Sequence, residues 1–216
     1  MRFTHICIHK VYKRELFFTS VAKEERIVRR KSPATLVSLF IVSAAITAVL
    51  GAFGSIVFPF LAPISSFYPG VAFQVAFGVW FGVIGAIAGG WVGPFIGIIL
   101  TGTSAPVAAA VAVGDFFQAF IPMLAFRVGR FDPRLKTSKD WTGHIVFNVI
   151  LAQIVGATIG AGSLAAFGIF PWDVFPIAWL GWFVSNVVVV GVITTILFKV
   201  FSDYLMKTAL YVEGFV

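Results

Sequence analysis

The chain has few charged residues and almost no cysteine. Asp, Glu, Lys and Arg make up 12 % of its 216 residues, against about 25 % in a typical soluble domain. A chain with so few charges could not cover its surface in water. The single cysteine, Cys7, excludes an intrachain disulfide. Hydrophobic residues make up 59 % of the chain and the mean hydropathy is +0.99, which together predict an integral membrane protein.

Motifs for catalysis and metal binding are also missing. The chain has no Gly-x-Ser-x-Gly, His-Glu-x-x-His or Walker sequence, and no apolar span carries two acids. His144 has no second soft ligand near it in the sequence. We therefore expect no enzyme activity, no cofactor and no metal site. If the protein consumes ATP, another subunit has to bind it.

The basic residues are concentrated in three clusters. Nine Lys and Arg lie within residues 2–31, five within 127–139, and the last two are Lys199 and Lys207. Basic clusters beside apolar spans face the cytoplasm in membrane proteins. A nucleic-acid-binding protein would need a basic face on a soluble domain, so the net charge of +7 does not predict a nucleic-acid partner.

Residues 1–33 carry more than half of the basic side chains. They lack the apolar region of a signal peptide before their charges end at Lys31. We interpret them as a basic cytoplasmic N-terminal extension, with a misassigned start codon as the alternative.

Apolar runs near the roughly 20 residues that a spanning helix needs lie at about 34–57, 105–127, 144–168 and 177–198. A further run, 71–103, is too long for one ordinary span, and its Gly89-Gly90 pair predicts a turn. An even number of crossings has to separate two cytoplasmic basic clusters, so this run should form two short helices or a re-entrant hairpin.

The predicted fold is thus an all-α, polytopic membrane helical bundle of about six transmembrane segments, with the third short or re-entrant. The transmembrane domain covers 34–200 and a cytoplasmic tail covers 201–216. We expect a multi-pass protein of the plasma membrane with both termini in the cytoplasm.

Asp115 is the acid nearest the middle of a predicted span. A carboxylate there costs roughly 2.5–3.5 kcal/mol on insertion scales, so it needs a partner, a cavity or a function. Gln118 lies three residues on, on the same helix face. The pair predicts a polar anchor in a substrate cavity. The alternative is a packing clamp that is hydrogen-bonded to a neighbouring helix.

Other residues in the spans extend this candidate substrate site. Gln74, Asn148 and Asn186 are isolated amides, which either contact a ligand or join helices to one another. Trp182 lies four residues before Asn186 and suits the aromatic wall of a ligand cavity. We expect His144 to be interfacial.

Small residues recur in the first span, where Ala44, Ala48 and Ala52 form a ridge that allows another helix to approach closely. The ridge could serve either a partner protein or internal packing.

Residues 34–200 resemble the substrate-binding S component of energy-coupling-factor (ECF) transporters. The points of resemblance are the small size, six segments, the Gly-rich run 77–86, and the Gly114-Asp115 segment that ends at Pro122 and Phe126-Arg127. The resemblance implies a pocket that opens outward and a vitamin, a vitamin precursor or a metal ion as substrate. It also implies a transmembrane coupling subunit, on which an Ala-x-x-x-Ala motif of the first helix docks, and two ATPases. Ala44, Ala48 and Ala52 match that motif.

A second resemblance is to membrane-associated sensor domains of bacterial signalling proteins. It rests on Gly114-Asp115, Pro171-Trp172 and the series Trp179, Trp182 and Asn186. Residues 199–216 are too few for an output domain. This alternative therefore implies a sensory or scaffolding module that acts through a partner.

Overall fold

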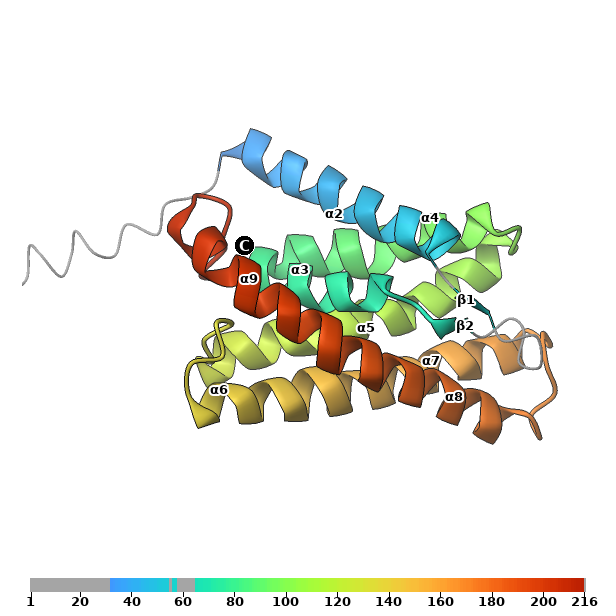
Figure 1. The fold of residues 1–216 in the computed structure, drawn as a ribbon. Helices are drawn as coiled ribbons and strands as arrows, with labels where there is room; N and C mark the ends of the chain where they lie inside the picture. The colour runs from blue at the N-terminus through green and yellow to red at the C-terminus, as the bar shows by residue number, and fades with distance from the viewer. Residues whose placement is uncertain (1–31, 55, 58–64, 216) are drawn as a thin grey trace, which may run out of the picture. The chain divides into compact units, whose positions relative to one another are not determined.

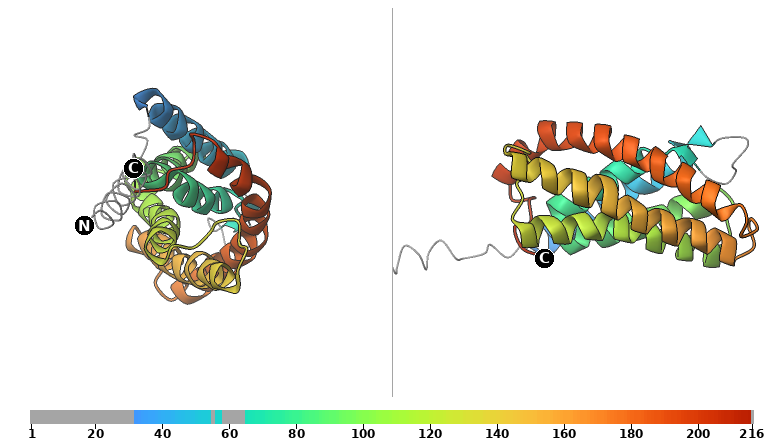
Figure 2. Two further views of the ribbon diagram at one scale, coloured as in Figure 1. Left: turned by 90° about the vertical axis from the view of Figure 1, so that its left-hand side faces the viewer. Right: turned by 90° about the horizontal axis from the view of Figure 1, so that it is seen from below.

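The computed structural model describes residues 32–54, 56–57 and 65–215. The predicted N-terminal extension lies almost wholly outside them. Five helical stretches of the described chain are long and apolar enough to cross a membrane: Pro33–Phe53, Gly70–Leu100, Ala105–Gly129, Ser138–Ala166 and Phe175–Lys207. The predicted all-α fold is thereby confirmed, and these five helices are compatible with the predicted multi-pass membrane protein. They run alongside one another, and the direction of the chain alternates when the two limbs of the stretch Gly70–Leu100 are counted separately (Figures 1 and 2).

Three of the stretches contain a π-helical turn that joins two α-helices. In chain order the elements are α2 (Pro33–Phe53), β1 (Ile56–Val57), β2 (Ser65–Phe67), α3 (Gly70–Ile87), η1 (Ala88–Val92), α4 (Gly93–Leu100), α5 (Ala105–Gly129), α6 (Ser138–Gly143), η2 (His144–Leu151), α7 (Ala152–Ala166), α8 (Phe175–Val189), η3 (Val190–Thr194) and α9 (Thr195–Lys207). The short strands β1 and β2 pair antiparallel. Because α9 continues to Lys207, the first residues of the predicted C-terminal tail are helical.

The stretch Gly70–Leu100 reverses direction at Gly82. This residue has a φ of 68° and a ψ of −147°, a backbone region open essentially to glycine. Beyond it the chain doubles back, so that Gly85 lies against the carbonyl oxygen of Phe77 and Gly89 lies against the Phe77 side chain. Figure 1 shows the two limbs of this hairpin, 70–81 and 83–100, side by side.

The predicted turn at Gly89-Gly90 is therefore wrong. Both glycines lie in η1, where the backbone stays helical, and the reversal occurs earlier in the chain. Gly89 faces the Cβ of Ser43 on α2, and Gly90 faces Ala119 on α5. They serve close helix packing rather than a turn.

Small residues set the distance between several helices. A methyl group at Gly93 would collide with Thr47 and one at Gly97 would lie 2.9 Å from the carbonyl oxygen of Ala48. Gly114 of α5 packs in the same way on Gly156 of α7. Such close approach supplies the van der Waals contact that holds helices together in lipid.

The two ends of the bundle differ in charge. One end, here called the basic end, holds loop 130–137 and the C-terminal residues (Figure 1), and Gly82 packs against Phe215 there. In the described chain all Lys and Arg lie at or toward it. The opposite end, here called the loop end, is formed by 54–57, 65–69, 101–104 and 167–174. Its charged residue within the described ranges is Asp173.

Arg127 ties the C-terminal residues to the basic end. Its guanidinium donates to the carbonyl oxygens of Val79 (2.8 Å), Gly214 (2.7 Å) and Val212 (2.5 Å). The tail also bonds the reversal itself, since Val83 N donates to the Phe215 carbonyl oxygen at 2.8 Å. The tail thus satisfies backbone groups that the break at Gly82 leaves without helical partners.

Candidate functional site

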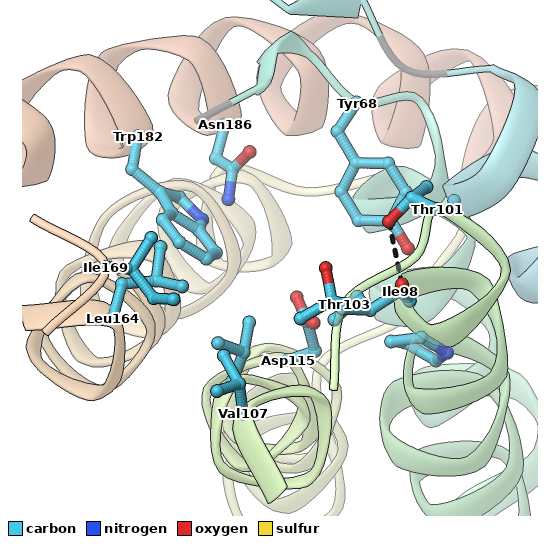
Figure 3. Close-up of a pocket in the computed structure, with 13 residues that line it drawn as sticks. Tyr68, Ile98, Thr101, Thr103, Val107, Asp115, Leu164, Ile169, Trp182 and Asn186 are labelled. Atoms are coloured by element: carbon cyan, nitrogen blue, oxygen red, sulfur yellow. Dashed lines mark hydrogen bonds between the residues drawn. The ribbon is translucent and has the colours of Figure 1, made fainter. Parts of the chain in front are cut away.

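A cavity of about 350 Å³ lies in the half of the bundle nearest the loop end (Figure 3). Residues from five helices and three loops surround it. Its lining consists of Gly51, Tyr68, Pro94, Ile98, Thr101, Thr103, Val107, Val111, Asp115, Leu164, Ile169, Trp182 and Asn186. The cavity therefore brings together three of the predicted substrate-binding residues, namely Asp115, Trp182 and Asn186.

Asp115 reaches the cavity from α5. Val107, Val111 and Asp115 recur every four residues and so share one helix face. The side chain of Asp115 is 3 % exposed, and its Oδ1 has no hydrogen-bond partner among the described residues. Gln74, another predicted residue, is fully buried and lies behind the lining, beside the Asp115 carboxyl group.

Tyr68 is a site residue that the sequence did not predict. It follows β2, in the segment between the predicted apolar runs 34–57 and 71–103. Its hydroxyl accepts a hydrogen bond of 2.8 Å from Gln74 Nε2. Figure 3 shows the Tyr68 ring across the cavity from Trp182 and Asn186. Since the limb 70–81 is short, the residues just before it come to lie inside the bundle.

Asn186 and Trp182 lie one turn apart on α8 and face the cavity together (Figure 3). Asn186 is 2 % exposed, and its Nδ2 has no partner in the described chain. The Trp182 indole rests on Gly160 of α7, where a methyl group would lie 2.5 Å from Cη2. Gly160 therefore lets the indole pack directly against α7.

Besides Gln74, two predicted residues do not line the cavity. Gln118 is fully buried and packs against Gly156 of α7. The side chain of Asn148 contacts His144 Nδ1 at 2.9 Å, toward the basic end. Both residues therefore contact neighbouring helices or side chains rather than the space beside Asp115.

His144, which was expected to be interfacial, is buried inside the bundle, and its depth in the membrane stays a prediction. The side chain is 1 % exposed, and its Nε2 lies 3.0 Å from Thr195 Oγ1. The reason is the helix start. Thr137 and Asp140 form a capping box that begins the helix at Ser138, so His144 lies more than a turn inside it.

The alanine ridge is partly covered. Ala44 and Ala48 are 8 % and 6 % exposed and face Gly93 and Gly97 across the contact of α2 with α4. Ala52 is half-buried. The structure thus gives the ridge an internal packing role, and docking of a partner there stays a prediction.

The chain matches no protein-family model, no curated protein and no solved structure. In the part of the chain that the structure describes, no group of three His, Cys, Asp or Glu residues could hold a metal ion. The class of protein is therefore defined by the fold and the cavity alone. It is a helical protein of the membrane type with a largely apolar cavity and buried, unpaired polar groups.

Proposed function

We propose that this protein is the membrane-embedded substrate-binding subunit of an uptake transporter for a small molecule such as a vitamin or a vitamin precursor. Separate ATPase subunits supply the energy through a coupling subunit. The observation that carries the proposal is the cavity toward the loop end, where Asp115 Oδ1 and Asn186 Nδ2 have no partner among the described residues. Buried polar groups without partners cost free energy, which a ligand that pairs with them would recover.

The size and lining of the cavity support a small ligand. Its volume lies at the lower end of the 300–1,000 Å³ found for ligand pockets, which are mostly apolar with a few placed polar groups. Here aliphatic side chains and Trp182 form the walls, while Asp115, Asn186 and Tyr68 supply the polar groups.

We also propose six membrane crossings, because the limbs on either side of Gly82 count separately. The limb 70–81 has 12 residues and is about 18 Å long. Because the hydrocarbon core is roughly 30 Å thick, this limb begins inside the membrane, surrounded by the other helices of the bundle. The basic end then faces the cytoplasm and the cavity lies toward the outside of the plasma membrane. The basic clusters support this orientation.

Analysis of co-purifying small molecules tests the proposal. The wild-type protein is purified in mild detergent, extracted with organic solvent, and the extract is analysed by mass spectrometry. We expect one small molecule to be enriched with the wild type and depleted about tenfold or more in Asp115→Asn. Asp173→Asn is the matched control, because it removes an acid of the loop end that does not line the cavity.

Two results would count against the proposal. One is the absence of any enriched molecule together with no thermal shift across a panel of vitamins. The other is co-purification of a kinase or cyclase without an uptake defect on deletion. The second result would favour the sensory or scaffolding module.

A further inference from the structure

The first observation about ligand class is that Asp115 has no cationic partner among the described residues of the bundle. The sequence contains no Lys or Arg between residues 32 and 126 or between 140 and 198. Arg127 is the nearest cation along α5, 12 residues or about 18 Å from Asp115. Its guanidinium is held by the carbonyl oxygens of Val79, Val212 and Gly214.

The second observation is the set of polar groups around the carboxyl group. Gln74 and Tyr68 supply a neutral amide and a neutral hydroxyl, and Asn186 supplies another amide. An anionic ligand would therefore meet a carboxyl group and no positive charge. In a low-dielectric site such like-charge contact is unfavourable, whereas a cation is attracted.

The third observation is the wall opposite Asp115. The indole of Trp182 lines the cavity (Figure 3), and an indole ring attracts cations to its face more strongly than other aromatic rings do. Aliphatic side chains of Val107, Val111, Ile98 and Leu164 line the remaining space. This wall suits an apolar ring or chain attached to the charged group.

Volume limits the size of the ligand. At the roughly 30 Å³ that a water molecule occupies in the liquid, the cavity holds about a dozen non-hydrogen atoms. The approach from the loop end also favours positive charge, because Asp173 is the charged residue there within the described ranges.

We infer that the ligand of this cavity is a small organic monocation, a protonated amine or a cationic nitrogen heterocycle, whose charge contacts Asp115 while its apolar part lies against Trp182. This inference rests on the proposed function and specifies its substrate class. Asp115 would bind the charged group of the ligand, and Trp182 would contact its apolar part.

Three probes with the same ring and different charge test the inference. Phenethylamine is cationic, 2-phenylethanol is neutral and phenylacetate is anionic at neutral pH. Binding of each to the full chain in detergent is measured by calorimetry at millimolar concentration. We expect the amine to bind about tenfold more tightly than the alcohol and phenylacetate to bind most weakly.

Variants separate the two assigned roles. Asp115→Asn should reduce the preference for the amine over the alcohol to about twofold or less, whereas Trp182→Leu should weaken binding of both compounds. Asp173→Asn should leave the affinity ranking of the probes unchanged. If Asp115→Asn does not fold, the ranking of the three probes on the wild type still decides.

The alcohol or phenylacetate binding as tightly as the amine to the wild type would overturn the inference. The proposed function would then survive, because the cavity would still bind a small molecule. Failure of all three probes to bind would also overturn the inference. The extraction experiment, which uses no assumption about charge, would then decide the proposed function separately.

Discussion

Replacing Gly82 by alanine tests the helix reversal, because a straight helix and a reversal predict opposite signs. In a straight helix the change removes an interior glycine and should stabilise the protein by about 1 kcal/mol. At the observed φ of 68° and ψ of −147°, an L-residue costs roughly 1–3 kcal/mol in backbone strain.

A second cost comes from the C-terminal residues. The new methyl group would meet the carbonyl oxygen of Phe215, which accepts the hydrogen bond from Val83 N. Loss of that bond costs about 0.5–1.5 kcal/mol. We therefore expect Gly82→Ala to destabilise the protein by about 1.5–4.5 kcal/mol in total.

The assay is reversible unfolding in mixed micelles with increasing dodecyl sulfate, followed by circular dichroism. Gly168→Ala is the matched control, since Gly168 has a φ of 70° with no atom within 4 Å of an added methyl group. It should cost about 1–2 kcal/mol, from the left-handed backbone alone. If Gly82→Ala proves neutral or stabilising, the reversal at Gly82 is refuted.

Further predictions concern the topology and the basic end. In a chain with Cys7→Ser, a cysteine at Gly102 should react with a membrane-impermeant maleimide added to whole cells, and one at Lys136 should react only after lysis. With five crossings instead of six, Gly102 would face the cytoplasm and Lys136 would face the outside, so the labelling pattern would be reversed. Arg127→Gln should release the C-terminal residues from the basic end. The amides of Val83 and Val212 are hydrogen-bonded across this contact. Their hydrogen exchange should become about 10–100-fold faster, because hydrogen bonds to a charged group contribute roughly 1.5–3 kcal/mol to stability. Burial alone would raise the pKa of Asp132, but hydrogen bonds from Arg134 outweigh it and hold the pKa below its usual value. Asp132 should thus stabilise the fold above about pH 4 and lose this effect as the pH falls further, so Asp132→Asn should reduce the loss of stability on acidification.

The sequence predicted the helices better than the place where one of them breaks. Residues 105–127 were predicted to be a helix and α5 runs from Ala105 to Gly129, because apolar length is visible in composition. The break was placed at Gly89-Gly90 because glycine residues crowd that region. A glycine that adopts a positive φ and one that admits a neighbouring helix look the same in sequence, and only the folded partners, Ser43 and Ala119, distinguish them.

The site was predicted where a polar residue is isolated in an apolar span. Asp115 and Asn186 were found in this way, because burying either side chain in lipid without a polar partner or a ligand costs free energy. Gln118 was grouped with Asp115 by its spacing, but three residues leave a rotation of about 60° on a helix of 3.6 residues per turn. That rotation turns Gln118 toward Gly156. Tyr68 gave no signal, because it precedes a helix that starts unusually deep in the bundle.

The short limb 70–81 explains why the cavity exists where it does. α5 has 25 residues, whereas this limb has 12, so it fills only the half of the bundle nearest the basic end. The other half is left to the segment before it, which supplies Tyr68 instead of another helical turn, and Tyr68 is held by Gln74 from the start of the limb. The reversal at Gly82 therefore has two consequences. It makes the number of passes even under the proposed six crossings, and it leaves beside Asp115 a space that a full-length helix would have filled.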